Sequence, residues 1–297
     1  MQFSKLELEH KHLFDEYFKK FNPQASELTF TNLFMWRDYY RISFTIVNNL
    51  LIIISEPCRS EQFSFMFIGN LDEDNFRDAY FKVGEYFENR NWKLKFQRIE
   101  EQYLDYFRKY GDGLKFCNDQ NNSDYVYQTD NLINLTGRKY HGKRNHINRF
   151  KKEYEYEYVP LTVEYLDECR RIMDKWCEGR DCNCHRGSYC EKHANEELLK
   201  NYEALGCKGA LIKVNGKFEA YAIGDLLNHN TGVVHIEKAN SNINGLYTFI
   251  NQQFCEREFS MTKYMNREQD MGEEGLRKAK KSYHPVKMVN KYTIVQK

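Results

Sequence analysis

Apolar residues in the first half of the chain follow helix-like and strand-like periods in turn. Recurrence every three or four positions predicts amphipathic helices, and short apolar runs rich in β-branched and aromatic residues predict strands. Helices are predicted at 6–21, 30–40, 74–89 and 101–108, and strands at 63–68 and 93–97. Two more strands are predicted within 41–55, joined at Asn48-Asn49, and a polar loop at 119–124. The first half therefore mixes helices and strands.

The second half shows a clearer order of elements. Helices are predicted at 138–154, 162–178, 196–205, 246–258 and 272–283. Strands are predicted at 155–160, 209–214, 217–227, 233–239, 263–269 and 286–295. Asn215-Gly216 is the strongest hairpin signal in the chain, and Gly206 is expected to end a helix. This order predicts an α+β (mixed α/β) fold with mixed, mostly antiparallel sheets flanked by helices.

Length and composition limit the class of protein. A chain of 297 residues suits one large domain or two of about 150 residues. Lys and Arg number 44 and Asp and Glu 43, so the protein is not basic overall, although local patches remain open. The N-terminal stretch MQFSKLELEHKHLF has no apolar segment of signal-peptide length. The longest aliphatic run, Leu50–Ile54, is too short for a membrane span. Nine cysteines without a secretion signal favour reduced thiols, so a cytoplasmic protein is expected.

The densest cluster of charge in the last quarter divides into two parts. Asp270 and Glu273 have the spacing of a capping box, which predicts the start of a helix whose inner side carries Leu276, Ala279 and Tyr283. Asn266, Arg267 and Glu268 precede it on a strand and are candidate site residues. Arg277 and Lys281 on the helix are candidate phosphate contacts.

The strand at 233–239 carries further candidates. Its alternation places His235 and Glu237 on one face and Lys238 on the other. An acid among apolar strand positions needs a partner or a raised pKa. A salt bridge to a neighbouring strand is therefore the alternative to a catalytic or substrate-contacting role for Glu237.

The loop that follows this strand leads into a helix N-terminus, where unpaired N–H groups and the helix dipole favour an anion. The candidate anion-binding residues are Asn240, Ser241, Asn242, Asn244 and Gly245. The alternative is a polar turn in which an Asn or Ser side chain caps the helix.

Residues 137–152 form a basic segment with seven Lys or Arg, two His and no acid. In a nearly neutral protein this clustering predicts contact with a polyanion such as RNA, a phospholipid headgroup or a nucleotide. Lys143, Arg144 and Arg149 are the residues predicted to contact this polyanion. A solvated helix face, or pairing with nearby glutamates, is the alternative.

Cysteines and histidines gather between 177 and 193. They are Cys177, Cys182, Cys184, His185, Cys190 and His193. Their spacing is poor for tetrahedral zinc, so reduced thiols and no metal are expected.

Two resemblances add to this interpretation. The order of elements in the last quarter resembles the fold of GCN5-related N-acetyltransferases. Four stretches resemble the phosphatidylglycerol lysyltransferase C-terminal-domain family: ELTFTNLFMW (27–36), TGRKYHGKRNHINRFKKEY (136–154), HIEKAN (235–240) and NREQDMGEEGLRKAKKSYHP (266–285). The resemblance implies two tandem acetyltransferase-like domains, at 1–136 and 137–297, with the site in the second. It also implies kinship with aminoacyl-tRNA-dependent transferases that modify lipids or extend peptidoglycan bridges.

The resemblance further implies roles for individual residues. Glu237 lies where the fold places a general base, Glu268 lies across the same cleft, and Tyr283 lies near the position of the general acid. A core aromatic that ends a helix before Pro285 is the alternative for Tyr283.

The expected function is aminoacyl transfer from aminoacyl-tRNA to an amine or hydroxyl of a small molecule or lipid headgroup. Ile243 stands where the acetyltransferase phosphate loop has glycine, so acyl-CoA is the second choice of donor. A non-catalytic module that binds RNA or anions is the remaining alternative.

Overall fold

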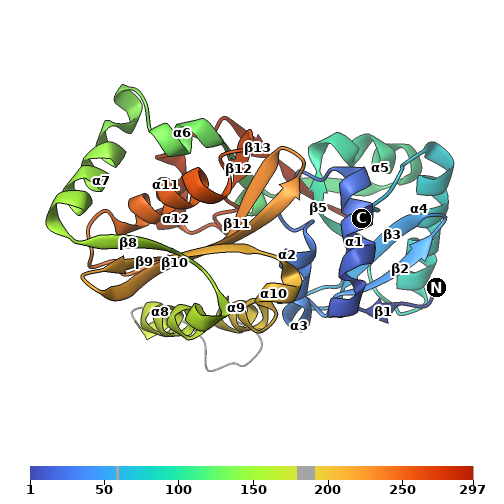
Figure 1. Ribbon diagram of the computed structural model, residues 1–297. Coiled ribbons are helices and arrows are strands. Elements are labelled where there is room, and N and C mark those ends of the chain that lie inside the picture. Colours follow the sequence, from blue (N-terminus) through green and yellow to red (C-terminus); the bar gives the residue numbers. More distant parts are fainter. Residues whose placement is uncertain (58–59, 179–190, 297) are drawn as a thin grey trace. The chain divides into compact units, whose positions relative to one another are not determined.

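The computed structural model describes residues 1–57, 60–178 and 191–296, which form two compact units, each built on its own seven-stranded mixed sheet (Figure 1). Unit 1 comprises Met1–Asp124, Gln269–Glu274 and Met288–Lys297, and unit 2 comprises Tyr125–Glu268 and Gly275–Lys287. The expected boundary between 136 and 137 differs from this division, because residues 126–128 already pair in the second sheet and the last strand of the chain pairs in the first.

Unit 1 has the strand order β1-β2-β3-β4-β5-β14-β6. Its strands are β1 (Ser4–Lys5), β2 (Ser43–Val47), β3 (Leu50–Ser55), β4 (Phe63–Ser64), β5 (Lys95–Glu100), β6 (Leu114–Asn118) and β14 (Lys291–Gln296). Its helices are α1 (Lys11–Phe21), α2 (Phe30–Met35), α3 (Arg37–Tyr40), α4 (Glu73–Glu88) and α5 (Leu104–Tyr110), with short 3-10 turns at Leu8–His10, Glu101–Tyr103 and Gln120–Asn122.

Aromatic side chains supply much of the core of unit 1. The ring of Phe14 lies 5.9, 5.6 and 5.0 Å from the rings of Phe18, Phe30 and Phe44. The predicted turn at Asn48-Asn49 is confirmed, with φ of 48° and 61°, the left-handed values that a tight hairpin needs. The sequence pattern missed β6, a short edge strand whose partner comes from the chain's end.

Unit 2 has the strand order β13-β7-β12-β11-β10-β9-β8. Its strands are β7 (Asp124–Gln128), β8 (Tyr156–Pro160), β9 (Lys208–Val214), β10 (Lys217–Asn228), β11 (Thr231–Ala239), β12 (Tyr264–Asn266) and β13 (Lys287–Val289). Its helices are α6 (Thr129–Asn134), α7 (His141–Glu153), α8 (Leu166–Glu178), α9 (Glu191–Lys200), α10 (Tyr202–Leu205), α11 (Leu246–Glu258) and α12 (Glu274–Lys281), with 3-10 turns at Arg138–Tyr140 and Val163–Tyr165.

Helices lie on both faces of this second sheet (Figure 1). Ala220 and Ala222 of β10 pack in a core with Phe249 of α11, whereas Tyr221 between them donates its hydroxyl to Asn195 of α9. The hairpin at Asn215-Gly216 and the left-handed Gly206 after α10 are confirmed. The predicted bounds of α11 are also confirmed.

One predicted strand, 286–295, is two strands in different sheets. β13 pairs in the second sheet and β14 in the first. Apolar patterning predicts a strand but carries no information on its partner, so the prediction could not separate them. No helix of the described residues is long and apolar enough to cross a bilayer.

Candidate functional site

Strands β11 and β12 of unit 2 part from each other at the residues that the sequence singles out. They pair in parallel from Thr231↔Tyr264 only as far as Val233↔Asn266, although β11 continues to Ala239. Past this point two side-chain contacts join the segments: Arg267 Nη2 lies 3.0 Å from Glu237 Oε1, and Glu268 Oε1 lies 3.1 Å from His235 Nδ1. We call His235, Glu237, Arg267 and Glu268 the strand fork. The strand predicted at 263–269 thus ends earlier than expected.

Glu237 is held on both of its oxygens. Arg267 donates to Oε1, and Nδ2 of Asn251 on α11 donates to Oε2 at 2.9 Å. The Arg267 and Glu237 side chains are only 13% and 12% exposed. Burial alone lowers the pKa of Arg267, but the Glu237 carboxylate outweighs it, so the pKa is raised. The salt bridge anticipated as an alternative for Glu237 is confirmed.

Three polar atoms around the fork are buried without a hydrogen-bond partner among the described residues. They are Arg267 Nη1, Asn251 Oδ1 and His235 Nε2. Each unsatisfied group of this kind costs about 1–3 kcal/mol. Arg267 Nη1 is a donor and Asn251 Oδ1 is an acceptor. Both belong to side chains that donate hydrogen bonds to the Glu237 carboxylate. This arrangement suits a ligand that both accepts and donates hydrogen bonds.

Tyr283 lies beside two cations. Lys143 Nζ is 3.8 Å and Arg267 Cζ 4.8 Å from the centroid of its ring. Tyr283 is also part of the hydrophobic core of unit 2, so the core alternative is confirmed for its ring. Burial raises the pKa of its hydroxyl, and Arg267 opposes the rise.

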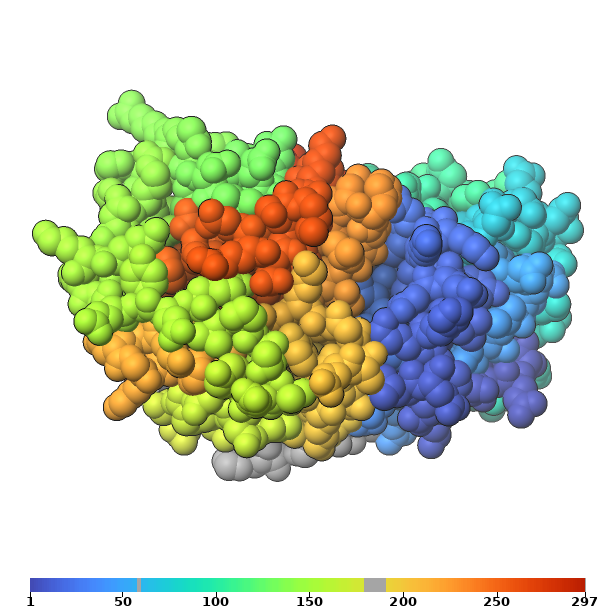
Figure 2. Space-filling model, viewed as in Figure 1, coloured from blue at the N-terminus to red at the C-terminus, as the bar shows by residue number. Residues whose placement is uncertain are grey.

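Lys143 turns inward from the basic segment. Figure 2 shows the green segment around 130–150 next to the orange-red segment around 270–285 that holds Tyr283. Burial, reinforced by repulsion from Arg267, lowers the pKa of Lys143 to about 8. Lys143 therefore lies near the strand fork, although it is part of the basic segment.

Glu268 is held in an unusual backbone conformation. Its φ is 55°, in the left-handed region that side chains other than glycine rarely occupy. Its N–H donates to Asn266 Oδ1 at 2.8 Å, and Asn266 is fully buried. Asn266, a predicted substrate contact, thus shapes the turn that brings Glu268 to His235.

Other predicted site residues lie away from the fork. Lys238 faces the opposite side of the sheet, where its Nζ lies 2.7 Å from Glu191 and 3.5 Å from the ring centroid of Trp176.

The predicted contacts in the basic segment and in the loop before α11 also lie elsewhere. Arg144 donates to the carbonyls of Leu135 and Gly137. Arg149 pairs with Glu153 at 2.7 Å, Asn240 donates to Glu219, and Ser241, Asn242 and Asn244 are exposed.

Gly245 is explained by packing between helices. Its φ is 85°, and a Cβ there would lie 2.3 Å from the His146 carbonyl of α7. The alternative of a polar turn is confirmed, since Asn242 N donates to Asn240 Oδ1, but its Asn or Ser cap is wrong, because no side chain caps α11. An anion at this helix N-terminus stays a prediction.

The final helix is rotated from its predicted phase. Ala279 is exposed, whereas Lys280 is only 8% exposed and its Nζ donates to the Arg267 carbonyl. Lys281 is exposed and Arg277 half-buried. The helix begins at Glu274, because Met271 and Gly272 have left-handed φ values of 51° and 81°. Asp270 therefore does not start the helix, so the predicted capping box is wrong, and its side chain accepts a hydrogen bond from Gly272 N.

Sequence reasoning missed Asn251 and Lys280. Asn251 stands next to Ile250 and three residues before Phe254 on α11, so a polar side chain within an apolar helix face was the available signal. Lys280 carried no such signal because three neighbouring cations on the helix look alike.

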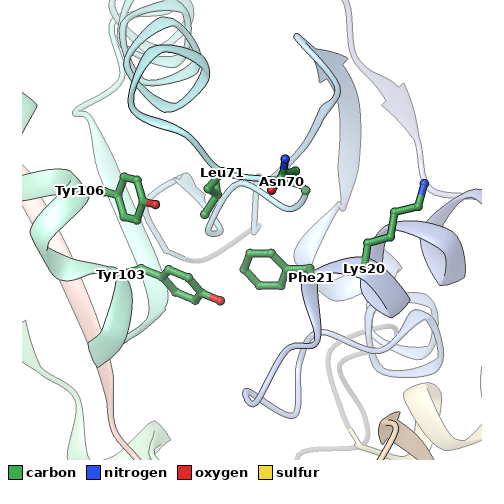
Figure 3. Close-up of a pocket in the computed structure, with 7 residues that line it drawn as sticks. Lys20, Phe21, Asn70, Leu71, Tyr103 and Tyr106 are labelled. Atoms are coloured by element: carbon green, nitrogen blue, oxygen red, sulfur yellow. The ribbon is translucent and has the colours of Figure 1, made fainter.

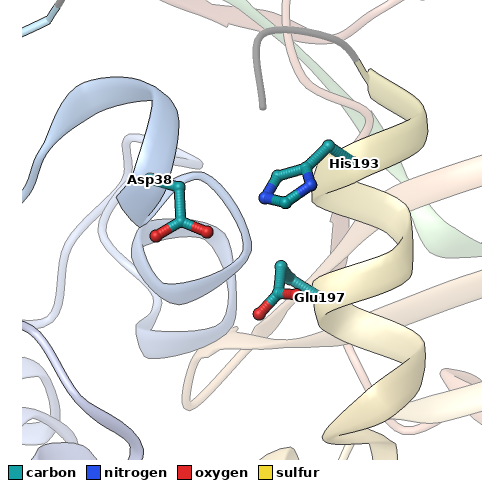
Figure 4. Close-up of side chains that lie close together, drawn as sticks. All are labelled: Asp38, His193 and Glu197. Carbon is teal, nitrogen blue, oxygen red and sulfur yellow. The ribbon is translucent and has the colours of Figure 1, made fainter. Parts of the chain in front are cut away.

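Most of the cysteine cluster, including Cys182, Cys184 and Cys190, lies outside the described residues. Cys177 is half-buried in α8. His193 and Glu197 lie one turn apart on α9 (Figure 4). The expectation of no metal stays a prediction.

Unit 1 has a pocket of about 460 Å³ (Figure 3). It is lined by Lys20, Phe21, Gly69, Asn70, Leu71, Tyr103 and Tyr106. The rings of Phe21 and Tyr103 are stacked, 5.2 Å apart. Among these lining residues only Lys20 carries a charge.

Comparisons with known proteins agree with this architecture. The sequence pattern of the family described as "Phosphatidylglycerol lysyltransferase, C-terminal" matches residues 18–295. A phosphatidylglycerol lysyltransferase of Staphylococcus epidermidis is 24% identical over 148 residues, which cover 47% of this chain and 15% of that protein. The match therefore spans a small part of that relative's length.

Solved structures extend the comparison to the whole chain. A conserved protein of unknown function from Bacteroides thetaiotaomicron is 33% identical, with a TM-score of 0.93 and full coverage of both chains. A tandem GNAT protein from the clavulanic acid biosynthesis pathway is 7% identical, with a TM-score of 0.54 over 100% of this chain and 98% of that one. The two units therefore have the tandem acetyltransferase-like fold that the sequence predicts.

Proposed function

Since the chain belongs to the phosphatidylglycerol lysyltransferase C-terminal family, we propose that it transfers an aminoacyl group from aminoacyl-tRNA to an amine or hydroxyl acceptor. The acceptor is a small molecule or a lipid headgroup, and the reaction takes place at the strand fork of unit 2.

The observation that carries this proposal is that Arg267 and Asn251 both donate hydrogen bonds to the Glu237 carboxylate. Each partner keeps one buried atom without a hydrogen-bond partner in the described part of the chain, a donor on Arg267 and an acceptor on Asn251. An aminoacyl ester offers the complement, because its carbonyl oxygen accepts hydrogen bonds and its α-ammonium group donates them.

Arg267 then acts where charge develops. Attack on the ester carbonyl makes a tetrahedral intermediate with a negative oxygen, and a fixed, charged donor stabilises it. Glu237 orients the guanidinium, and Asn251 Oδ1 accepts from the α-ammonium group. Because both Glu237 oxygens are already bonded, its geometry fits this positioning role better than that of the general base.

Cations around the fork favour an anionic donor. Lys143, Arg267 and Lys280 lie close to Tyr283 or to one another, and Glu237 balances one of them. Exposed cations continue along the basic segment at Arg138, Lys139, Lys151 and Lys152. A nucleic-acid backbone fits this distribution, and its binding should weaken as salt rises.

An acyl-CoA donor is the second candidate. The uncapped N-terminus of α11 would favour a phosphate. Ile243 makes an acyl-CoA donor less favourable, because this side chain packs against the core at the position where the acetyltransferase loop has glycine.

The test compares charged tRNA, uncharged tRNA and acetyl-CoA as ligands at low and moderate salt. Bulk tRNA charged with radiolabelled amino acids then serves as the donor, with a panel of amine and hydroxyl acceptors. We expect protein-dependent transfer, which Arg267→Lys lowers by about 100-fold or more. Arg257→Lys makes the same change at an exposed position of α11 and should leave the rate unchanged.

Three other outcomes count against the proposal. Transfer from acetyl-CoA alone would establish the second candidate. Binding of tRNA without any transfer would leave a non-catalytic RNA-binding module. Equal effects of the Arg267 and Arg257 variants would remove the fork from the reaction.

A further inference from the structure

His235 occupies an irregular position in β11. Ile236 pairs with Ile223 and Val234 pairs with Gly224, so β11 has one residue more than β10 at this point. The extra residue is His235. Bulges of this kind redirect a side chain and are frequent next to active sites.

The polypeptide around Glu268 is shaped to reach that histidine. Glu268 holds a left-handed φ of 55°, and buried Asn266 accepts its N–H. The Glu268 carboxylate reaches His235 Nδ1 at 3.1 Å, and the His235 side chain has no exposed surface. A strained turn, a bulge and a polar pair with a fully buried histidine therefore coincide at one place.

The pair decides which ring nitrogen carries the proton. A carboxylate only accepts hydrogen bonds, so Nδ1 of His235 must be the N–H that donates to Glu268. In a neutral ring Nε2 is then the nitrogen with the free lone pair. Nε2 is buried and has no hydrogen-bond partner among the described residues.

We infer that His235 is a further catalytic residue, which carries the acceptor's proton on Nε2 while Glu268 positions its ring. This inference rests on the proposed aminoacyl transfer. It assigns proton transfer to the His235–Glu268 pair and leaves oxyanion stabilisation to Arg267.

The acceptor's nitrogen or oxygen bonds to the ester carbonyl carbon and gives one proton to Nε2. The tetrahedral intermediate then collapses, and the bond between the carbonyl carbon and the tRNA ribose oxygen breaks. That oxygen takes the proton from Nε2, so the products are the aminoacylated acceptor, tRNA with a free hydroxyl and neutral His235.

Two substitutions separate this role from a purely structural one. His235→Asn keeps an N–H donor near the position of Nδ1 for Glu268 but removes Nε2. A structural pair should tolerate that change, whereas loss of a general base lowers kcat by about 10²–10⁴-fold. Glu268→Ala should lower kcat less, because Nε2 remains but its ring is no longer oriented. KM should change little in both, and thermal unfolding should confirm that both fold.

Nitrogen-15 NMR of the histidine rings gives a readout that needs no activity. The His235 signal is assigned by its loss in His235→Asn. In the neutral ring we expect the proton on Nδ1 and none on Nε2, and a change in this tautomer in Glu268→Ala, which removes the acceptor.

The outcomes keep this inference apart from the proposed function. A wild-type protein that transfers nothing from aminoacyl-tRNA overturns the function. An active wild type with an equally active His235→Asn variant overturns only the role of His235, as does a neutral ring that carries its proton on Nε2.

Discussion

Glu237 illustrates what a single position reveals about a site. An acid among the apolar residues of a strand indicates that a partner is needed, and Arg267 and Asn251 both serve. They lie 30 and 14 residues away in the chain. The sequence pattern therefore shows that Glu237 requires a polar partner. Which residues serve as partners depends on how β11, α11 and the segment after β12 pack together.

Lys143 provides a prediction at the same scale. Its pKa of about 8 arises from burial and from Arg267, while Glu237 acts in the opposite direction. Arg267→Met should therefore raise this pKa and Glu237→Gln should lower it further. Lysine side chains titrated by NMR give the measurement, with exposed Lys139 as the control. Shifts of the same sign in both variants would contradict the assigned causes.

The same pKa shift has a consequence for stability. The pKa of Lys143 in the folded protein lies below the value of about 10.4 for a free lysine, so the ammonium form opposes folding. This destabilisation is fully present below pH 8 and is relieved as the pH rises through the window between the two values. Lys143→Met should abolish that part of the pH dependence in urea unfolding.

Among the elements, α12 shows where periodicity misleads. The sequence predicts Ala279 on the inner side, but the helix buries Lys280, which holds the Arg267 carbonyl. Tyr127 and Tyr140 further fix this segment by donating their hydroxyls to the carbonyls of Lys280 and Tyr283. An eight-residue helix has only about two turns, so a few such contacts can outweigh its apolar pattern.

Lys280 and Lys281 form a matched pair for testing this orientation. Lys280→Met removes a buried donor and leaves the Arg267 carbonyl without that bond, which should cost about 1–3 kcal/mol of unfolding free energy. Lys281→Met, one residue further and exposed, should change it by no more than about 0.5 kcal/mol. Urea unfolding measures both. Equal losses would show that α12 is not oriented as described.

At the scale of the molecule, the chain's last strand completes the first sheet. Lys291 on β14 is fully buried, with Nζ 2.5 Å from Glu27 and 2.6 Å from Asp124. Arg98 also pairs with Glu27, so two cations and two carboxylates form one buried network within unit 1. Burial alone lowers the pKa of Lys291, but Asp124 and Glu27 outweigh it and raise the pKa. This network ties residues from both ends of the chain together.

Lys291→Met should therefore destabilise unit 1. Removing one member of a buried ion pair costs about 3–5 kcal/mol, because its partners keep their charges. Lys115→Met is the control, since Lys115 is exposed on β6 next to the same strand. Hydrogen exchange should show lost protection in β5, β6 and β14 and little change in β9 to β11. A Lys291 variant as stable as the Lys115 variant would contradict this account.

The sequence by itself determined the mixed α/β class, the tandem acetyltransferase-like fold, the hairpin turns at Asn48-Asn49 and Asn215-Gly216, and the strand carrying Glu237. These follow from local periodicity, turn residues and characteristic stretches of the chain, all of which the sequence contains directly. Only the tertiary structure decided that Glu237 pairs with Arg267, that Glu268 pairs with His235, that Lys280 points inward and that β14 belongs to the first sheet. Each of these depends on contacts between distant residues, where several side chains or strands of similar chemistry compete and packing selects among them.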